Sequence, residues 1–157
     1  MILSQVDVFS VPTRIITETE ENLRLAGRNG LELFVLWSGC VHGTEFLVET
    51  SHVPRQTSYR SDSGLMVRVE GDALHQLNAW LYEHGESLAV QVHAHPTEAF
   101  HSVTDDTYPI VTADGSISVV TADFCRQGFF SESTATYRLD GHTWLELDPP
   151  LGLFRVI

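Results

Sequence analysis

The feature that most constrains the fold is a nearly continuous apolar run from Leu31 to Val41, bounded by Gly30 and Gly43. Such a run, closed by glycine at both ends, is typical of a strand buried inside a sheet. Residues 44–50 are expected to return as its partner. The run contains one charged residue, Glu32. A charge there costs several kcal/mol unless it is paired or lies beside a metal ion. The alternative is a solvated carboxylate at the mouth of the strand.

Apolar residues at helical spacing predict a first helix over residues 13–26, ended by Gly27 and Gly30, with Thr17 and Glu20 as a candidate capping box. A second helix is expected to be capped by Asp72 and stopped by His84-Gly85. Its apolar stripe is Leu74, Leu77, Trp80 and Leu81.

Other strands are expected at residues 5–11, 65–69, 88–93, 108–112, 115–121, 135–139 and 143–147. Asp114-Gly115 and Asp140-Gly141 are candidate hairpin turns. Residues 51–64, rich in Ser, Arg, Thr and Asp, are expected to form an exposed loop. The sequence therefore predicts one α/β domain over residues 1–157, a mixed sheet flanked by helices.

Charge and cysteine content exclude several classes of protein. The net charge is −12 and the nine Lys and Arg residues are scattered, so nucleic acid is not an expected partner. Cys40 and Cys125 lack the spacing of a zinc ribbon or a disulfide framework, which favours a reducing compartment. No apolar run reaches the roughly 20 residues of a membrane span, and the N-terminus lacks the pattern of a signal peptide. We therefore expect a cytoplasmic protein with no membrane partner.

The segment that carries chemistry begins at His93 and His95, near the end of a predicted strand. Residues two apart on a strand point to the same side, so both imidazoles can reach one divalent cation. A carboxylate about ten residues later can supply a third ligand, which leaves a fourth tetrahedral position open for water, as in catalytic zinc sites. Taken alone, a His-x-His pair is more often two exposed polar side chains.

The surrounding residues resemble a known motif. His93-Ala94-His95-Pro96 and then Ser102-Val103-Thr104-Asp105 resemble the JAMM motif of the JAB/MPN metalloprotease family, His-x-His-Pro followed by Ser-x-x-Asp. That family also has an upstream Glu seven positions before a glycine, and Glu32 and Gly39 stand at this distance. The resemblance covers most of residues 1–125 and implies a cytidine-deaminase-like architecture.

By this resemblance, His93, His95 and Asp105 would bind Zn²⁺ and Glu32 would be the general base and acid. Ser102 would hydrogen-bond the tetrahedral oxyanion; the alternative is an ordinary turn or cap residue. The family includes enzymes that cleave amide or isopeptide bonds after the tail of ubiquitin-like proteins. A ubiquitin-like protein or its conjugate is therefore the expected substrate and partner.

Two departures concern spacing and size. The gap from His95 to Asp105 is ten, whereas eukaryotic deubiquitinating members commonly show eleven, which lands on Asp106. Asp105 is preferred because it preserves the Ser-x-x-Asp spacing. The chain also lacks the long insertions that recruit ubiquitin in larger members.

Several alternatives remain open at the level of sequence. One is a metallohydrolase of small amide conjugates, and another is a catalytically silent scaffold of the same fold. His101 is a candidate spare ligand or rim residue, and Cys40 with His42 is a conceivable nucleophile pair. A zinc deaminase is disfavoured because no Pro-Cys-x-x-Cys follows the histidines.

Overall fold

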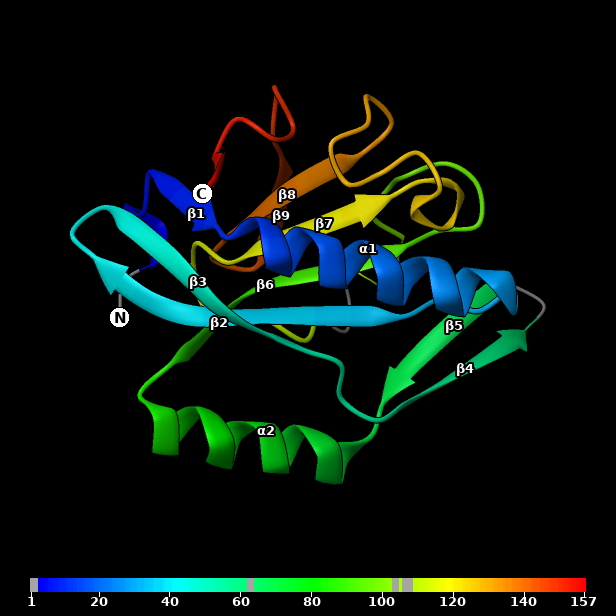
Figure 1. Cartoon of the computed structure of the whole chain (residues 1–157), viewed down its shortest axis with the longest axis horizontal. Coiled ribbons are helices and arrows are strands. Elements are labelled where there is room, and N and C mark those ends of the chain that lie inside the picture. The colour runs from blue at the N-terminus through cyan, green and yellow to red at the C-terminus, as the bar shows by residue number, and fades with distance from the viewer. Residues whose placement is uncertain (1–2, 62–63, 103–104, 106–108) are drawn as a thin grey trace.

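The computed structural model describes residues 3–61, 64–102, 105 and 109–157 (Figure 1). Within these residues, its elements are η1 (Leu3–Gln5), β1 (Val8–Val11), α1 (Thr13–Arg28), β2 (Phe34–His42), β3 (Glu45–His52), β4 (Gln56–Ser61), β5 (Gly64–Val69), α2 (Gly71–His84), β6 (Ser87–Ala94), β7 (Ile117–Thr121), η2 (Asp123–Cys125), β8 (Ala135–Asp140), β9 (Thr143–Glu146) and β10 (Phe154–Val156). None of its helices is long and apolar enough to cross a membrane.

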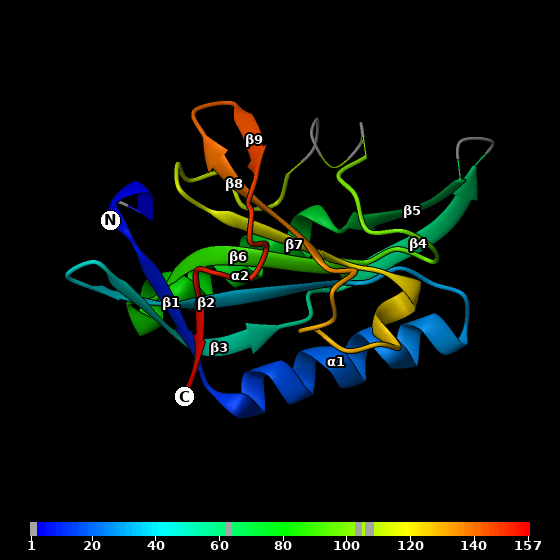
Figure 2. The same ribbon diagram turned by 90° about the horizontal axis from the view of Figure 1, so that it is seen from above.

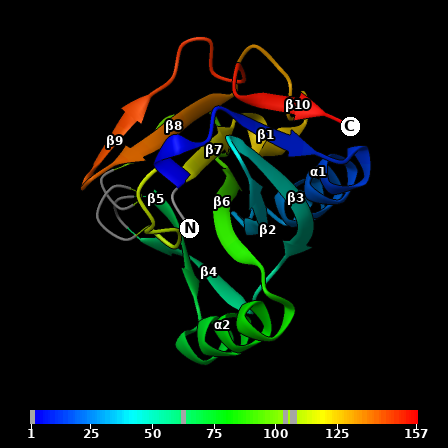
Figure 3. The same cartoon turned by 90° about the vertical axis from the view of Figure 1, so that its left-hand side faces the viewer.

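The strands of the main sheet are ordered β10-β1-β3-β2-β6-β7-β8-β9. The sheet is mixed, because β6 pairs antiparallel with β2 but parallel with β7. It is also curled, and the two helices lie on opposite faces of it (Figures 2 and 3). The predicted α/β class with a mixed sheet between helices is confirmed.

The two faces of the sheet bury different sets of side chains. On the α1 face, Ile15 and Leu23 of the helix pack with Val35 and Trp37 of β2 in the larger core. The Trp37 indole is fully buried and donates a hydrogen bond to the Thr19 hydroxyl at 2.9 Å. On the α2 face, a smaller core contains Phe34, Leu36, Leu77 and Leu81. The apolar run identified in the sequence is thus the central strand that both cores share.

The predicted start of helix α1 at Thr13 is confirmed, but the helix continues through Gly27 to Arg28. Thr17 lies in its second turn and donates to the carbonyl of Thr13. The predicted Thr17–Glu20 capping box is therefore wrong. Helix α2 has Glu70 rather than Asp72 at its N-cap position. Its expected end is confirmed, because Gly85 adopts the left-handed conformation (φ 67°) that glycine tolerates best.

The predicted loop over residues 51–64 is wrong, because β4 and β5 form a separate antiparallel hairpin there. This two-stranded sheet exposes one face, and alternate residues of β4 are exposed, so the polar composition of the segment misled the prediction. The predicted return strand 44–50 and the turn at Asp140-Gly141 are confirmed.

The predicted strand 108–112 is also wrong over its described residues 109–112. The amides of Ile110 and Val111 donate to the side chain of Gln91 instead of to a neighbouring strand. Asp114-Gly115 is consequently no hairpin turn. Gly115 has φ +88°, and a Cβ there would lie 2.2 Å from the backbone nitrogen of Ser4.

Candidate metal centre

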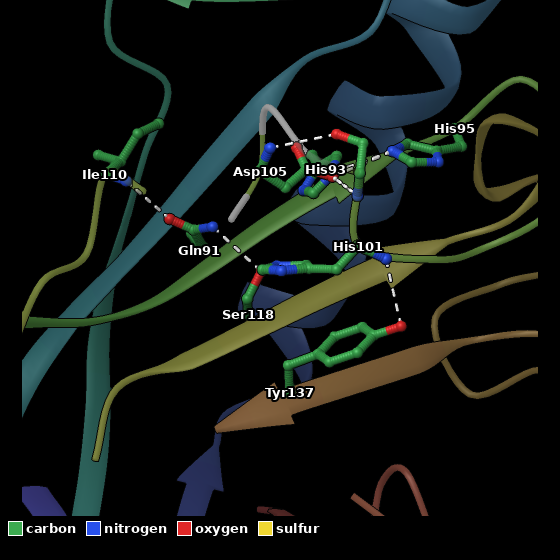
Figure 4. A network of polar contacts seen from close by, with 9 residues as sticks. Gln91, His93, His95, His101, Asp105, Ile110, Ser118 and Tyr137 are labelled. Atoms are coloured by element: carbon green, nitrogen blue, oxygen red, sulfur yellow. Dashed lines mark hydrogen bonds and ion pairs between the residues drawn. The ribbon is translucent and has the colours of Figure 1, made fainter. Parts of the chain in front are cut away.

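Three side-chain atoms converge at the C-terminal end of β6. His93 Nε2 lies 3.2 Å from His95 Nε2 and 3.2 Å from Asp105 Oδ2, and His95 Nε2 lies 3.5 Å from the same oxygen. All three residues are buried. Figure 4 shows both imidazoles and the carboxylate directed at one another. The structure therefore brings together the three ligands predicted from the sequence.

The geometry fits a tetrahedral divalent cation. Zinc bonds of about 2.0–2.1 Å at tetrahedral angles place donor atoms about 3.3–3.4 Å apart. The three observed separations bracket that value. Two neutral imidazoles can supply at most two Nε2 protons to these three contacts, whereas a cation among the atoms would satisfy all three at once. The donor set, two imidazole nitrogens and one carboxylate oxygen, is one that catalytic zinc sites use.

The protonation states also suit a metal. Burial opposes ionisation of Asp105, but hydrogen bonds with His93 and His95 outweigh it and hold the pKa of that carboxyl well below its usual range. Complete burial lowers the pKa of His93 despite the attraction of Asp105. A neutral imidazole beside an ionised carboxylate is the state that binds metal.

Asp105 is fixed by a reciprocal pair of hydrogen bonds with Ser102. The Ser102 amide donates to Asp105 Oδ2 at 2.9 Å, and the Asp105 amide donates to Ser102 Oγ at 3.1 Å. This is the geometry of a capping box, and it requires a spacing of three residues. Here the Ser-x-x-Asp spacing has a local structural cause. Asp106, the alternative ligand, lies outside the described residues.

Glu32 precedes β2 instead of opening it, because the strand begins at Phe34. It is nevertheless only 8% exposed. Desolvation raises the pKa of Glu32 to about 7, while His95 lowers it and Asp105 raises it further. The Glu32 carboxylate therefore lies within electrostatic range of His95 and Asp105. A carboxylate with a pKa near neutrality can both accept and return a proton.

The hairpin that sequence reasoning missed supports this end of β2. Gln56 of β4 accepts a hydrogen bond from the Phe34 amide at 2.7 Å and donates to the Phe34 carbonyl at 3.0 Å. The Phe34 ring in turn packs against the ring of His93, with centroids 4.7 Å apart. Gln56 thus fixes the backbone next to Glu32 and the ring that packs on a candidate ligand. In the sequence, the only indication of this support is a glutamine within the polar segment 51–64.

The other candidate residues do not join the centre. His101 stacks on Tyr137, with ring centroids 4.4 Å apart, and its Nε2 is hydrogen-bonded to Ser118. Cys40 lies near the far end of β2, where burial and the neighbouring Glu49 and Glu86 raise its pKa. A raised pKa disfavours the thiolate that a nucleophile requires.

This three-ligand centre, together with the relative described below, supports a metal-dependent hydrolase. No protein-family model matches the chain. A probable metalloprotease of Sinorhizobium fredii (strain NBRC 101917 / NGR234), y4jG, is 36% identical over 156 residues, which are 99% of this chain and 96% of that protein. The chain therefore belongs to the family of this probable metalloprotease.

A solved structure shows the same fold at lower similarity. The solution structure of protein DSY2949 from Desulfitobacterium hafniense matches with a TM-score of 0.64 and 16% identity, over 96% of this chain and 93% of that one. At this identity the likeness concerns the fold alone.

Proposed function

We propose that this metal-dependent hydrolase is a zinc peptidase of the JAMM type. It would cleave a peptide or isopeptide bond after the C-terminal tail of a ubiquitin-like protein. The observation that carries the proposal is the buried Glu32 carboxylate, with a pKa of about 7, beside the convergent His93, His95 and Asp105. The motif resemblance supplies the substrate class. The proposed compartment is the cytoplasm, since Cys40 and Cys125 are both free thiols.

In this proposal His93, His95 and Asp105 hold the zinc ion. When bound, zinc polarises the scissile carbonyl and lowers the pKa of a coordinated water to about 7. Glu32 takes the proton that the attacking water loses and delivers it to the leaving nitrogen. Water thus adds across the C–N bond, and a carboxylate and an amine are released. Proton transfer of this kind contributes typically 10²–10⁴-fold to the rate.

Ser102 has a hydrogen-bonding capacity that suits the oxyanion. Its Oγ accepts the amide of Asp105, so the hydroxyl proton remains to be donated elsewhere. We propose that it is donated to the developing oxyanion. In another enzyme, removal of one oxyanion donor raised the activation free energy by about 2.7–4 kcal/mol.

The β4–β5 hairpin offers a means of holding an extended tail. Among the described residues, β4 and β5 hydrogen-bond as strands only to each other, which leaves an outer edge on each. Gln56 ties this hairpin to Phe34, two residues from Glu32. A substrate tail added as a further strand would cross the centre in extended form.

The test compares three substrates with the zinc-loaded protein: a ubiquitin-like protein fused through its terminal glycine to a reporter, the matching isopeptide conjugate, and a panel of small C-terminal amides. Preferential cleavage of the first two supports the proposal. Cleavage of only the small amides would favour a small-conjugate hydrolase, and no cleavage by zinc-loaded protein would favour a silent scaffold.

The same assay, with zinc content measured alongside, tests which of the two neighbouring aspartates is the third metal ligand. Asp105→Ala should lose both zinc and cleavage, because two ligands cannot complete the site. Asp106→Ala should retain both. The reverse result would show that the longer spacing sets the geometry.

A further inference from the structure

Gln91 is a fully buried amide in the middle of the apolar strand β6, two residues before His93. A buried amide without hydrogen bonds costs several kcal/mol, so its partners indicate its role. Its Oε1 accepts the amides of Ile110 at 3.0 Å and Val111 at 3.2 Å. Its Nε2 donates to Ser118 Oγ at 3.0 Å. All three bonds lead away from its own strand.

Ser118 extends the network to the other side of Asp105. Its hydroxyl oxygen accepts from Gln91 Nε2 and is also hydrogen-bonded to His101 Nε2, 2.9 Å away. His101 immediately precedes Ser102, which is bonded to Asp105. The His101 amide also donates to the Tyr137 hydroxyl at 3.2 Å. Figure 4 shows this chain of contacts from Ile110 through Gln91 and Ser118 to His101 and Tyr137.

In the sequence, Asp105 therefore lies between His101 and Ile110. Gln91 anchors both of them, Ile110 directly and His101 through Ser118. That side chain stands on the strand that carries His93, on the same face, since residues two apart on a strand face the same way. We propose that Gln91 is the positioning residue of the metal centre: it holds the residues that flank Asp105 in the sequence, His101 and Ile110, in place against the strand that carries His93. This inference rests on the proposed metal site.

The physical reason is that Asp105, a residue in helical conformation, contributes to the site from outside the sheet that carries His93. Functional groups must be held within about 0.5 Å of their productive geometry, so a ligand that lies outside the sheet needs contacts that fix it relative to the sheet. Interactions that orient metal ligands commonly change metal affinity 10–100-fold when removed. The Gln91 network connects His101, Ile110 and Val111 to the two strands β6 and β7, and so ties the positions on both sides of Asp105 to the sheet.

The first experiment is residue-resolved amide hydrogen exchange on metal-free protein, wild type against Gln91→Met. Met fills a similar volume but makes none of the three hydrogen bonds. Exchange at Ile110 and Val111 should accelerate directly. Exchange at Ser102 and Asp105 should accelerate as well, because their mutual hydrogen bonds depend on the anchors. Wild-type protection at Ser102 and Asp105 in this variant would overturn the proposal.

The second experiment measures zinc affinity by competition with a chelator. Gln91→Met should bind zinc about 10–100-fold more weakly than the wild type. Ser118→Ala removes the link between Gln91 and His101 but keeps the bonds of Gln91 to Ile110 and Val111, so its loss of zinc affinity should be smaller. This second variant keeps the proposal testable if Gln91→Met does not fold. Unchanged affinity in both variants would overturn the proposal.

Two controls separate positioning from general destabilisation. Thr136→Val removes another fully buried hydroxyl of the sheet, one with no hydrogen-bond partner among the described residues. Leu23→Ala lowers global stability from the opposite face of the sheet. Both should retain wild-type zinc affinity, and a loss equal to that of Gln91→Met would make the effect non-specific. Wild-type protein that takes up no zinc would refute the proposed function, while the exchange measurement would still decide the role of Gln91.

Discussion

Two clusters of similar side chains lie near opposite ends of β6 and behave differently. One is the candidate metal centre. The other, which we call the Ser38 cluster, consists of Ser38, Thr50, His52 and Glu86. It also combines a histidine, here half-buried, with a carboxylate and a serine. Ser38 Oγ lies 2.7 Å from His52 Nε2 and donates to Glu86 Oε2 at 2.5 Å, and Thr50 donates to Glu86 Oε1 at 3.0 Å.

The difference is in the supply of protons. In the Ser38 cluster, each close contact has a proton of its own: Ser38 and Thr50 donate to Glu86, and His52 donates to Ser38. Burial lowers the pKa of His52, against the attraction of Glu86, so the ring is neutral. At the metal centre three acceptor atoms meet with too few protons to separate them. The comparison teaches that residue types alone do not distinguish a structural network from a ligand site.

The largest expected effect is on metal content. His93→Ala should reduce zinc from about one per chain to about none, because the remaining two ligands cannot complete the site. The matched change in the Ser38 cluster, His52→Ala, should leave zinc content unchanged. Elemental analysis of both variants measures the difference. Equal zinc content in the two would remove the distinction between the clusters.

The next effect is on turnover. Glu32→Gln should leave zinc bound and lower the rate of cleavage by about 10²–10⁴-fold, because Gln keeps the shape of the side chain but cannot accept a proton. Glu86→Gln, the matched carboxylate of the Ser38 cluster, should keep the wild-type rate. Steady-state kinetics with zinc analysis alongside test the pair. Loss of zinc from Glu32→Gln would make Glu32 a ligand, and a near-normal rate would assign the base elsewhere.

A smaller effect concerns the pH dependence of stability in metal-free protein. The pKa of Glu32 is about 7 in the folded state against an ordinary 4.5, so the folded state binds this proton more tightly. The associated stability is fully present below pH 4.5 and is lost as the pH rises through 7. The shift of about 2.5 pKa units corresponds to a loss of about 3 kcal/mol, at 1.36 kcal/mol per unit. Denaturant unfolding at several pH values should show this slope in wild type and a flatter profile in Glu32→Gln.

The smallest effect is at Ser38. Ser38→Ala removes the donor to one oxygen of Glu86 and should lower the free energy of unfolding by about 1–2 kcal/mol. Zinc content and cleavage rate should be unchanged, since His52 donates to Ser38 and cannot act as its base. Loss of activity with normal zinc content would instead make Ser38 part of the reaction.

The sequence was sufficient to predict the parts of the site that depend on local spacing. His93 and His95 face the same side because strand geometry has a period of two. Ser102 and Asp105 pair because a capping box spans three residues. For Glu32 the apolar run left two alternatives, a buried carboxylate and a solvated one at the mouth of the strand, and the structure shows the buried one. Whether the three ligand residues bind zinc stays a prediction.

What the sequence did not predict depends on contacts between distant segments. The predicted strand 65–69 is confirmed as β5, but β4, with which it pairs, has too polar a composition to be predicted from strand patterns. Residues 109–112 have strand-like composition, but the side chain of Gln91 satisfies two of their amides. A polar residue inside the apolar strand 88–93 was a visible signal, yet its partners lie 19, 20 and 27 positions away.

The glycine at position 39 has a consequence for tracing the ancestry of this fold. A Cβ at that position would lie 1.9 Å from the carbonyl oxygen of Leu47, beside the bulge where β2 shifts register against β3. The requirement is steric and independent of the metal, whereas the need for His93, His95 and Asp105 lasts only as long as the chemistry does. A lineage that abandoned hydrolysis would be free to change its ligands but not this glycine. Gly39 is therefore the position by which descendants that have lost the activity could still be recognised.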